Sequence, residues 1–433
     1  MRMTESAVER VMDDGLRVAV IPMPGFQKTY ATLTTAFGSI DTHMPDGRKL
    51  PDGIAHFLEH QMFAMPEGDV FSMFSRKGAS SNAFTSAEQT SYLFTCTDDW
   101  KYHLKTLLNF VQTPYFEPKN VDKERGIIAQ EIRMIQDRPD WQAYQLMLQS
   151  RFEKHPWRIP ISGTVQSIED IDSDWLYACH AQNYHPRQLI LVVCGDVEPE
   201  AVFELTAAHQ ADLPSRPYME RLIPRAADEY NTGKISFSAN GINSVTPSKT
   251  LYHEWKLPLD KFRISFLDSP PSISPDVNMR RQMITNLALD WRFGSSAANI
   301  QPLYAKGLIT DQFSPGWLNV PGAAMTVLGG DTPDPARVFE ELYQLSIQPV
   351  ADKEREEFER LRRKSVASWV RLRQSPEGLA QAYIRSLLRD QDVFKTGQLF
   401  QSIRMEEVEA RFYELMNWED AALTVVGKKQ VSA

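Results

Sequence analysis

Hydrophobic and polar residues alternate over some stretches of this chain and recur at helical spacing over others. The alternation predicts half-buried strands of antiparallel type at 16–22, 28–37 and 90–96. The helical period predicts helices at 52–64, 99–112, 121–138 and 354–373. Two apolar runs that contain a late glycine, LILVVCGD at 189–196 and AALTVVGKK at 421–429, are typical of buried strands. The chain therefore mixes strands and helices.

The two halves of the chain resemble each other. In each half a short strand-like run leads into an amphipathic helix, a proline-containing turn and a long helix that begins near DKER. We therefore predict an α+β fold of two homologous domains, each an antiparallel sheet packed with helices, over 1–215 and 261–433. Scattered Pro, Gly, Ser and Asn over 216–260 predict a linker or irregular connection between them.

Composition and charge narrow the class of protein. Of 433 residues, 42% are hydrophobic and 24% charged, as in an ordinary folded protein, and the net charge of −9 argues against nucleic-acid or membrane binding. Cys96, Cys179 and Cys194 follow no CxxC spacing, so we expect neither a disulfide framework nor a cysteine zinc site. The sequence has no apolar run of transmembrane length and no apolar signal core near residue 1. These features predict a cytoplasmic protein.

The stretch GIAHFLEHQMF carries the most informative spacing. Its His56, Glu59 and His60 follow the order HxxEH, and on a helix positions i and i+4 share a face with i+3 beside them. Two imidazoles can then bind one metal ion while the carboxylate of Glu59 points at a metal-bound water. The alternative is an ordinary helix whose histidines cap its end or pair with acids.

A third metal ligand is expected from VDKERGIIAQEIRMI. Glu124 and Glu131 lie seven positions apart, on one helix face, and Ile127, Ile128 and Ile135 flank them. Two carboxylates in an apolar stripe are costly unless a cation or donors compensate them. A partly exposed helix with acids near its N-terminus would explain Glu124 but not Glu131. We predict that Glu131 is the third ligand of a catalytic zinc, one per chain, and that Glu124 supports the site.

Three segments of the sequence carry a specific family resemblance. The segments HFLEH, GASSNAFTSAEQTSYLF and ERGIIAQE resemble the inverzincin metallopeptidases of the pitrilysin–insulysin family, in the branch of half-length subunits that includes the mitochondrial processing peptidase. The chain is most similar to the zinc-bearing member of bacterial pairs whose sister subunit lacks the metal motif. The resemblance implies the same zinc ligands, His56, His60 and Glu131, with Glu59 as general base and Glu124 orienting the site.

The resemblance also implies a place for the substrate. In the family, the segment that matches 78–85 is an edge strand near the metal, and the peptide substrate adds a strand to it. Asn82 and Ala83 match the positions that hold the substrate backbone, with Phe84 beside them. Taken alone, Asn82 after a glycine and two serines is typical of a turn.

One departure from the family matters for activity. The family completes its site with an arginine and a tyrosine from the second half, which stabilise the oxyanion; the matching positions here hold Tyr304 and, allowing one deletion, Thr310. We therefore predict a heterodimer in which a zinc-less homologous subunit supplies Arg and Tyr. A homodimer with other donors, for which Arg280, Arg281 and Arg292 are candidates, is the alternative.

The predicted function is that of a zinc metalloendopeptidase. Zinc-activated water would attack the peptide bond with Glu59 as general base, and the family's enclosing halves imply short or unstructured peptides as substrates. The rival function is a non-catalytic structural or binding subunit of the same fold.

Overall fold

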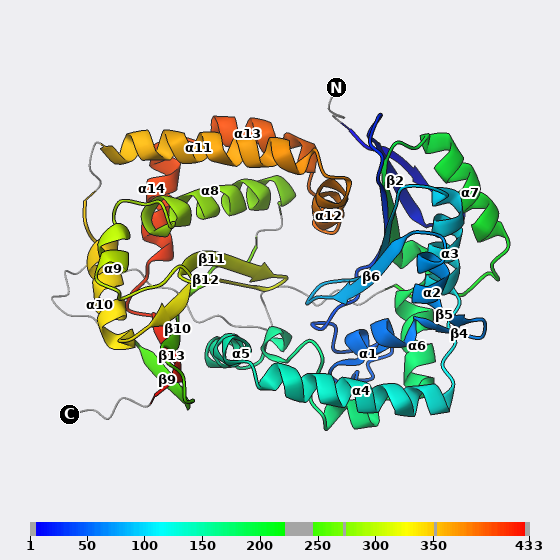
Figure 1. Cartoon of the computed structure of the whole chain (residues 1–433), viewed down its shortest axis with the longest axis horizontal. Coiled ribbons are helices and arrows are strands. Elements are labelled where there is room, and N and C mark those ends of the chain that lie inside the picture. Colours follow the sequence, from blue (N-terminus) through cyan, green and yellow to red (C-terminus); the bar gives the residue numbers. More distant parts are fainter. Residues whose placement is uncertain (1–5, 221–245, 272–273, 350–352, 429–433) are drawn as a thin grey trace. The chain divides into compact units, whose positions relative to one another are not determined.

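The computed structural model describes residues 6–220, 246–271, 274–349 and 353–428. Contacts group the described residues into two compact units (Figure 1). The first unit holds 6–133, 159–220 and 369–395; the second holds 134–158, 246–368 less the gaps, and 396–428. Among the described residues, none of the helices combines the length and the apolar character needed to cross a membrane.

A six-stranded sheet forms the centre of the first unit, in the order β1-β2-β8-β3-β7-β6. Neighbouring strands are antiparallel except for β2 and β8, which are parallel. The strands are β1 (Val8–Val11), β2 (Arg17–Pro22), β3 (Thr29–Thr35), β6 (Ser80–Thr85), β7 (Thr90–Cys96) and β8 (Leu189–Gly195). A short hairpin of β4 (Ala64–Met65) and β5 (Gly68–Asp69) stands apart from this sheet. Strand β6 comes last in the strand order, so it is an edge strand of the sheet among the described residues.

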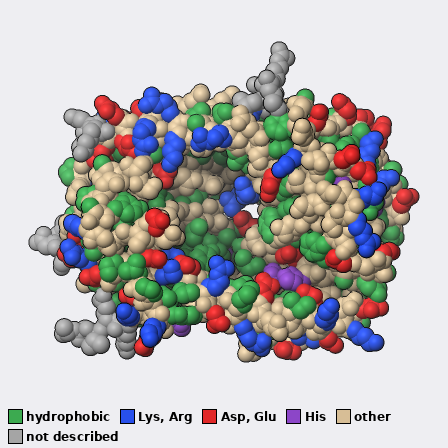
Figure 2. Space-filling view, viewed as in Figure 1, with side chains coloured by type: hydrophobic (Ala, Val, Ile, Leu, Met, Phe, Trp, Pro, Cys, Tyr) green, Lys and Arg blue, Asp and Glu red, His purple; other side chains and the backbone are tan. Residues whose placement is uncertain are grey.

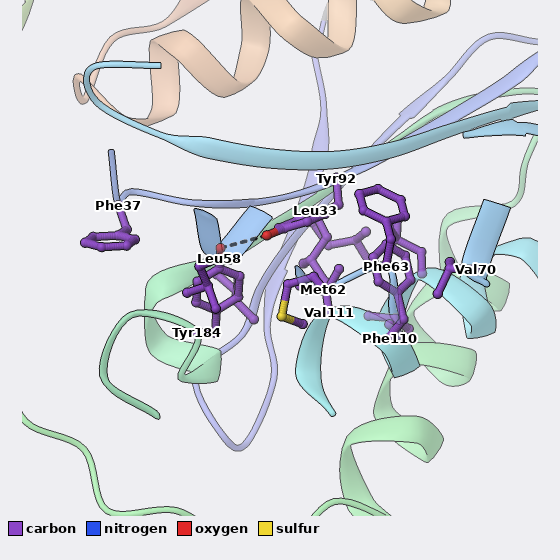
Figure 3. Packing of buried hydrophobic residues seen from close by; sticks show 14 of the residues in the cluster. Leu33, Phe37, Leu58, Met62, Phe63, Val70, Tyr92, Phe110, Val111 and Tyr184 are labelled. Atoms are coloured by element: carbon purple, nitrogen blue, oxygen red, sulfur yellow. Dashed lines mark hydrogen bonds between the residues drawn. The ribbon is translucent and has the colours of Figure 1, made fainter. Parts of the chain in front are cut away.

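Helices cover both faces of this sheet. They are α1 (Ile54–Gln61), α2 (Val70–Ser75), α3 (Trp100–Gln112), most of α4 (Pro118–Gln136), α6 (Ser173–Asn183), α7 (Pro199–Ala211) and α12 (Pro376–Leu387). Side chains from α1, α3 and α4 join a large core on one face, part of which is drawn in Figure 3. On the opposite face, Leu379 and Ile384 of α12 pack against Tyr30 and Val192.

The alternation predicted half-buried strands, and for β2 and β3 this prediction is wrong: the four central residues of β2, Val18–Ile21, are all buried. All seven residues of β3 are buried, including its threonines. The reason is that α12, which lies more than 300 residues later in the chain, covers the second face of the sheet. The buried threonines remain satisfied because Thr34 hydrogen-bonds Ser91 at 2.8 Å and Thr35 donates to the Asn183 carbonyl at 2.5 Å.

The second unit repeats the strand order of the first. Its sheet runs β11-β12-β10-β13-β9, and only β13 and β9 are parallel. The strands are β9 (Lys249–Glu254), β10 (Asp260–Asp268), β11 (Ser314–Val320), β12 (Ala323–Thr332) and β13 (Ala422–Gly427). In chain order these match β2, β3, β6, β7 and β8, with the parallel pair in the same place. The expected α+β fold of two similar sheets is thus confirmed, although each sheet contains one parallel pair.

Helices pack around the second sheet as well. They are α5 (Pro139–Arg151), α8 (Pro275–Phe293), α9 (Gln301–Ala305), α10 (Pro335–Ser346), most of α11 (Lys353–Leu372), α13 (Thr396–Ser402) and α14 (Met405–Leu415). Most of them bury apolar side chains in a second core, which includes Phe262, Leu287 and Phe412.

The two units are not simple consecutive segments. Helix α5 packs against β10 and β13, although it precedes residue 215, and α12 packs against β3 and β8, although it follows residue 261. Within the predicted linker 216–260, residues 221–245 lie outside the described residues. Residues 249–254 were expected to be irregular, but they form β9, because the backbone of this segment pairs with β13 and completes the sheet.

Candidate metal centre

Helix α1 carries the HxxEH residues and directly follows a glycine. Gly53 precedes the helix with φ +94°, a left-handed conformation, and a Cβ there would lie 2.5 Å from the Ser162 carbonyl oxygen. The Ser167 hydroxyl donates to the Asp52 carbonyl at 2.7 Å and ties the start of α1 to the same loop. The apolar face of α1 enters the core, where Leu58 (Figure 3) and Phe57 are fully buried. His56 and His60 are not among the buried residues of the helix.

Helix α4 presents the two glutamates to α1. Its buried residues are Val121, Ile128, Ala129 and Ile132, while Ile127, expected in the apolar stripe, is 44% exposed. Arg125 fixes the helix by donating to the carbonyl of Ile171 at 2.7 Å. Glu124 and Glu131 lie beside the buried positions and are half-buried. The stripe is therefore narrower than the sequence suggested, and the carboxylates lie at its margin.

Three side chains converge between α1 and α4. The Nε2 atom of His56 lies 3.7 Å from Oε1 of Glu131, and Nε2 of His60 lies 3.5 Å from Oε2. One ligand atom from each of the three residues lies within 4.8 Å of the others. Figure 2 shows histidine side chains flanked by acidic ones on the surface over α1.

These distances, which run to the two different oxygens of Glu131, are compatible with a shared zinc ion. They are long for hydrogen bonds, whose donor–acceptor distances are about 2.7–3.2 Å. Tetrahedral zinc with bonds of about 2.0–2.2 Å places its ligand atoms about 3.3–3.6 Å apart. Two imidazole nitrogens and one carboxylate oxygen are also a donor set that zinc accepts, with a fourth position left open for catalysis.

Glu124 contacts the ring nitrogen of His60 that is not the one near Glu131. Its Oε1 lies 2.9 Å from Nδ1 of His60; a carboxylate accepts, so Nδ1–H is the donor, and in the neutral ring Nε2 then carries the lone pair. A histidine that binds metal usually donates its second ring N–H in this way. The Nδ1 atom of His56 is buried and has no partner among the described residues.

The charges around the two histidines differ. Burial, with a smaller effect of neighbouring His60, lowers the pKa of His56 to about 3, so this imidazole is neutral at neutral pH. Burial also lowers the pKa of His60, but the hydrogen bond with Glu124 and the nearby carboxylates of Glu59 and Glu131 outweigh it and raise the pKa overall. The surrounding carboxylates therefore favour a positive charge at His60.

Glu59 has a different contact from the other acids. It is 9% exposed, and its Oε2 accepts a hydrogen bond of 2.7 Å from the hydroxyl of Thr85. Burial raises the pKa of Glu59, and the bond from Thr85 and the charge of His60 oppose this. Sequence reasoning missed Thr85, because a threonine at a strand end has no spacing signal that relates it to a helix 26 residues earlier.

The segment expected to bind substrate is the edge strand β6. Asn82 and Ala83 line a cavity of about 410 Å³ together with Glu59, His60 and Glu124. The side-chain oxygen of Asn82 accepts a hydrogen bond of 2.9 Å from the backbone N–H of Ala83.

The rest of the cavity wall is largely apolar. Phe63 and Phe71 line it and stack with ring centroids 4.1 Å apart, while Phe84 is half-buried and is not among the lining residues. The structure thus places the predicted base and two of the three predicted substrate positions around one hollow.

The positions expected to hold the oxyanion clamp lie in the second unit. Tyr304 packs against the second core, and the Thr310 hydroxyl accepts a hydrogen bond from the Gln312 backbone N–H at 3.3 Å. Neither side chain carries a positive charge.

The alternative cationic donors are also in the second unit, and all three are paired. Arg280 binds Glu407, Arg281 binds Asp268 and Arg292 binds Glu354, each within 2.8 Å. Any of them would have to give up an ion pair to contact a substrate.

Comparisons with known proteins identify the family of this chain. The family model "Insulinase (Peptidase family M16)" matches residues 39–165, and "Peptidase M16 inactive domain" matches 170–246. The uncharacterized zinc protease YmfH of Bacillus subtilis is 35% identical over 417 residues, which cover 94% of this chain and 93% of that protein. The chain belongs to peptidase family M16.

Solved structures support the same assignment. The crystal structure of a protein assigned as an M16-like peptidase from Alicyclobacillus acidocaldarius superposes with a TM-score of 0.85 at 28% identity, covering 97% of this chain and 98% of that one. A protease from Helicobacter pylori superposes with a TM-score of 0.79 over 97% and 99% of the chains; at 16% identity it shows the fold alone. The resemblance to the insulysin family is thus confirmed, and the family supports a zinc metallopeptidase in general.

Proposed function

We propose that this M16 chain is a zinc-dependent endopeptidase that hydrolyses short or unstructured peptides. The observation that carries the proposal is the convergence of His56, His60 and Glu131 at zinc-ligand distances, with Glu59 in the wall of the adjoining cavity. A buried carboxylate beside a metal site is the arrangement that a hydrolytic general base requires.

Each residue has one role in this proposal. His56, His60 and Glu131 would hold one zinc ion, and Glu124 would orient His60 through the 2.9 Å hydrogen bond. When bound, zinc supplies a Lewis acid that polarises the peptide carbonyl and lowers the pKa of water to about 7. Glu59 would accept the proton of the attacking water and then pass it to the leaving amine nitrogen.

The peptide would bind along β6. This strand is an edge of the first sheet, so its outward backbone groups can pair with an extended peptide in the manner of an added strand. Asn82 and Ala83, which line the cavity, would hold the peptide backbone, with Phe84 beside them. The side chain of Asn82 must release the Ala83 N–H if that group is to pair with substrate.

The active form is proposed to be a heterodimer. Tyr304 and Thr310 offer no cation for a developing oxyanion, and Arg280, Arg281 and Arg292 are held in ion pairs. Removing one oxyanion donor typically costs about 2.7–4 kcal/mol in the transition state, or a hundred- to a thousandfold in rate. A zinc-less homologous subunit that contributes Arg and Tyr would restore this contribution.

The test is hydrolysis of a quenched-peptide library by the zinc-loaded chain, with Glu59→Gln as the blank. Exposed Glu67→Gln is the matched control, since it removes the same charge nearby without touching the cavity. We expect one zinc per chain in all three proteins, and weak or undetectable cleavage until a homologous subunit is added.

Other outcomes would decide against parts of the proposal. Full activity of the chain alone, lost in Glu59→Gln, would refute the need for a partner and favour a self-sufficient homodimer. A chain that binds no zinc would refute the enzyme and favour a structural subunit of the same fold.

A further inference from the structure

Thr85 connects the proposed substrate strand to the proposed base. It is the last residue of β6, whereas Glu59 lies on α1, and the Thr85 hydroxyl is 2.7 Å from Oε2 of Glu59. An ionised carboxylate only accepts hydrogen bonds, so the threonine hydroxyl is the donor. A bond of this length to a charged acceptor belongs to the stronger class of hydrogen bonds.

The Thr85 side chain is itself held in place. Thr85 pairs with Thr90 across the β6–β7 ladder, and the two hydroxyl oxygens are 3.4 Å apart. The fully buried Thr90 donates to the Phe37 carbonyl at 2.9 Å, which fixes its own hydroxyl. Directly after β6, the Ser86 hydroxyl accepts from the backbone N–H of Gln89 at 3.2 Å and closes the turn. A β-branched side chain in such a frame has little freedom about χ1.

The contact leaves the two carboxylate oxygens of Glu59 in different situations. Oε2 accepts the hydrogen bond from Thr85, which leaves Oε1 to accept a hydrogen bond from a water in the cavity that Glu59 lines. Asn82 and Ala83, on the same strand as Thr85, line that cavity too. The strand that would align the peptide therefore also fixes the carboxylate that would act on it.

We propose that Thr85 is a positioning residue that holds Glu59 with Oε1 toward the cavity and ties the base to the substrate strand. This inference rests on the proposed peptidase function. It assigns to Thr85 an effect on the rate of bond cleavage and none on zinc binding or on the affinity for the peptide.

The first experiment separates kcat from KM in the active form of the zinc-loaded protein. Thr85→Val keeps the shape but removes the hydroxyl, and we expect kcat to fall about ten- to a hundredfold, as for a lost hydrogen bond to a charged group, with KM changed less than about twofold. Thr85→Ser restores the hydroxyl and should recover most of kcat. An unchanged kcat in Thr85→Val, or an equal loss in Thr85→Ser, would overturn the proposal.

A matched control comes from the same pair of strands. Thr95 lies on β7 at the opposite end of the ladder, opposite Ser80, and Thr95→Val makes the same substitution there. We expect kcat of this variant to equal that of the wild type. A comparable loss of kcat in Thr95→Val would mean that the ladder in general matters and the hydroxyl of Thr85 does not.

The second experiment needs no activity. Urea unfolding of the full zinc-loaded chain is measured for wild type, Thr85→Val, Glu59→Ala and the double variant. If Thr85 holds Glu59, Thr85→Val lowers the unfolding midpoint in the wild type but not in the Glu59→Ala background. Equal shifts in both backgrounds would overturn the proposal. If no peptide is cleaved by any form but this coupling is present, the proposed peptidase function fails while the positioning contact stands.

Discussion

The hydrogen bond between Glu124 and His60 gives a quantitative prediction for zinc affinity. The two atoms are 2.9 Å apart, and the side chains are 22% and 26% exposed, so water screens the bond only in part. Glu124→Gln removes the charge but keeps the size. A hydrogen bond to a charged group contributes about 1.5–3 kcal/mol. Loss of a residue that orients a metal-bound histidine costs about 10–100-fold in metal affinity. We expect zinc to bind about 10–100-fold more weakly to Glu124→Gln.

The measurement is zinc competition with a chromophoric chelator at one fixed pH. Asp122→Asn is the matched control, because it removes one charge from the same helix at a side chain that is 71% exposed and pairs with Arg125. We expect this control to change zinc affinity by less than about twofold. Glu131→Gln, which replaces a proposed ligand, should weaken zinc binding more than Glu124→Gln does. Wild-type affinity in Glu124→Gln would refute the orienting role, and an equal loss in Asp122→Asn would mean that helix charge, not the bond, is responsible.

Three further predictions concern stability. Gly53→Ala should lower the free energy of unfolding by at least about 1 kcal/mol and weaken zinc binding, because φ at this position is +94° and the new Cβ would meet the Ser162 carbonyl. A wild-type free energy in urea unfolding together with a wild-type zinc affinity in a chelator titration would contradict this prediction. Asp268→Asn should lower the free energy of unfolding in urea by about 3–5 kcal/mol without changing zinc affinity, since Asp268 is the buried anion between Arg281 and Arg411. A decrease of less than about 1 kcal/mol would mean that these ion pairs are dispensable for stability. Zinc at a hundredfold excess over its Kd should raise the free energy of unfolding by about 2.7 kcal/mol relative to chelator-treated protein. If zinc leaves the free energy of unfolding unchanged in the same assay, this result would argue against a zinc site in the folded chain.

Some features of the site follow from local sequence spacing alone. His56, Glu59 and His60 share one region of α1 because the helix turns once every 3.6 residues, and Glu124 and Glu131 lie two turns apart on α4 for the same reason. The strands 16–22 and 90–96 and the helices 99–112 and 354–373 were predicted from periodicity and are confirmed within a residue or two at each end.

Other features depend on elements that are distant in the chain. Periodicity assigned the polar positions of β3 to solvent, but α12 returns from residues 376–387 to cover them. The composition of 249–254 gave no strand signal, and pairing with β13 made it one. Arg280, Arg281 and Arg292 were open as oxyanion donors until the fold placed an acid beside each.

The sequence by itself thus determined which residues can act together on one helix, because helical spacing is a local property of the backbone. It determined the candidate metal ligands, the base and the repeated order of elements. Only the tertiary structure decided that the Glu131 carboxylate lies near both histidines and that the Thr85 hydroxyl hydrogen-bonds Glu59. The first contact depends on how α4 packs against α1, and the second on how β6 does. Residue spacing along the chain encodes neither.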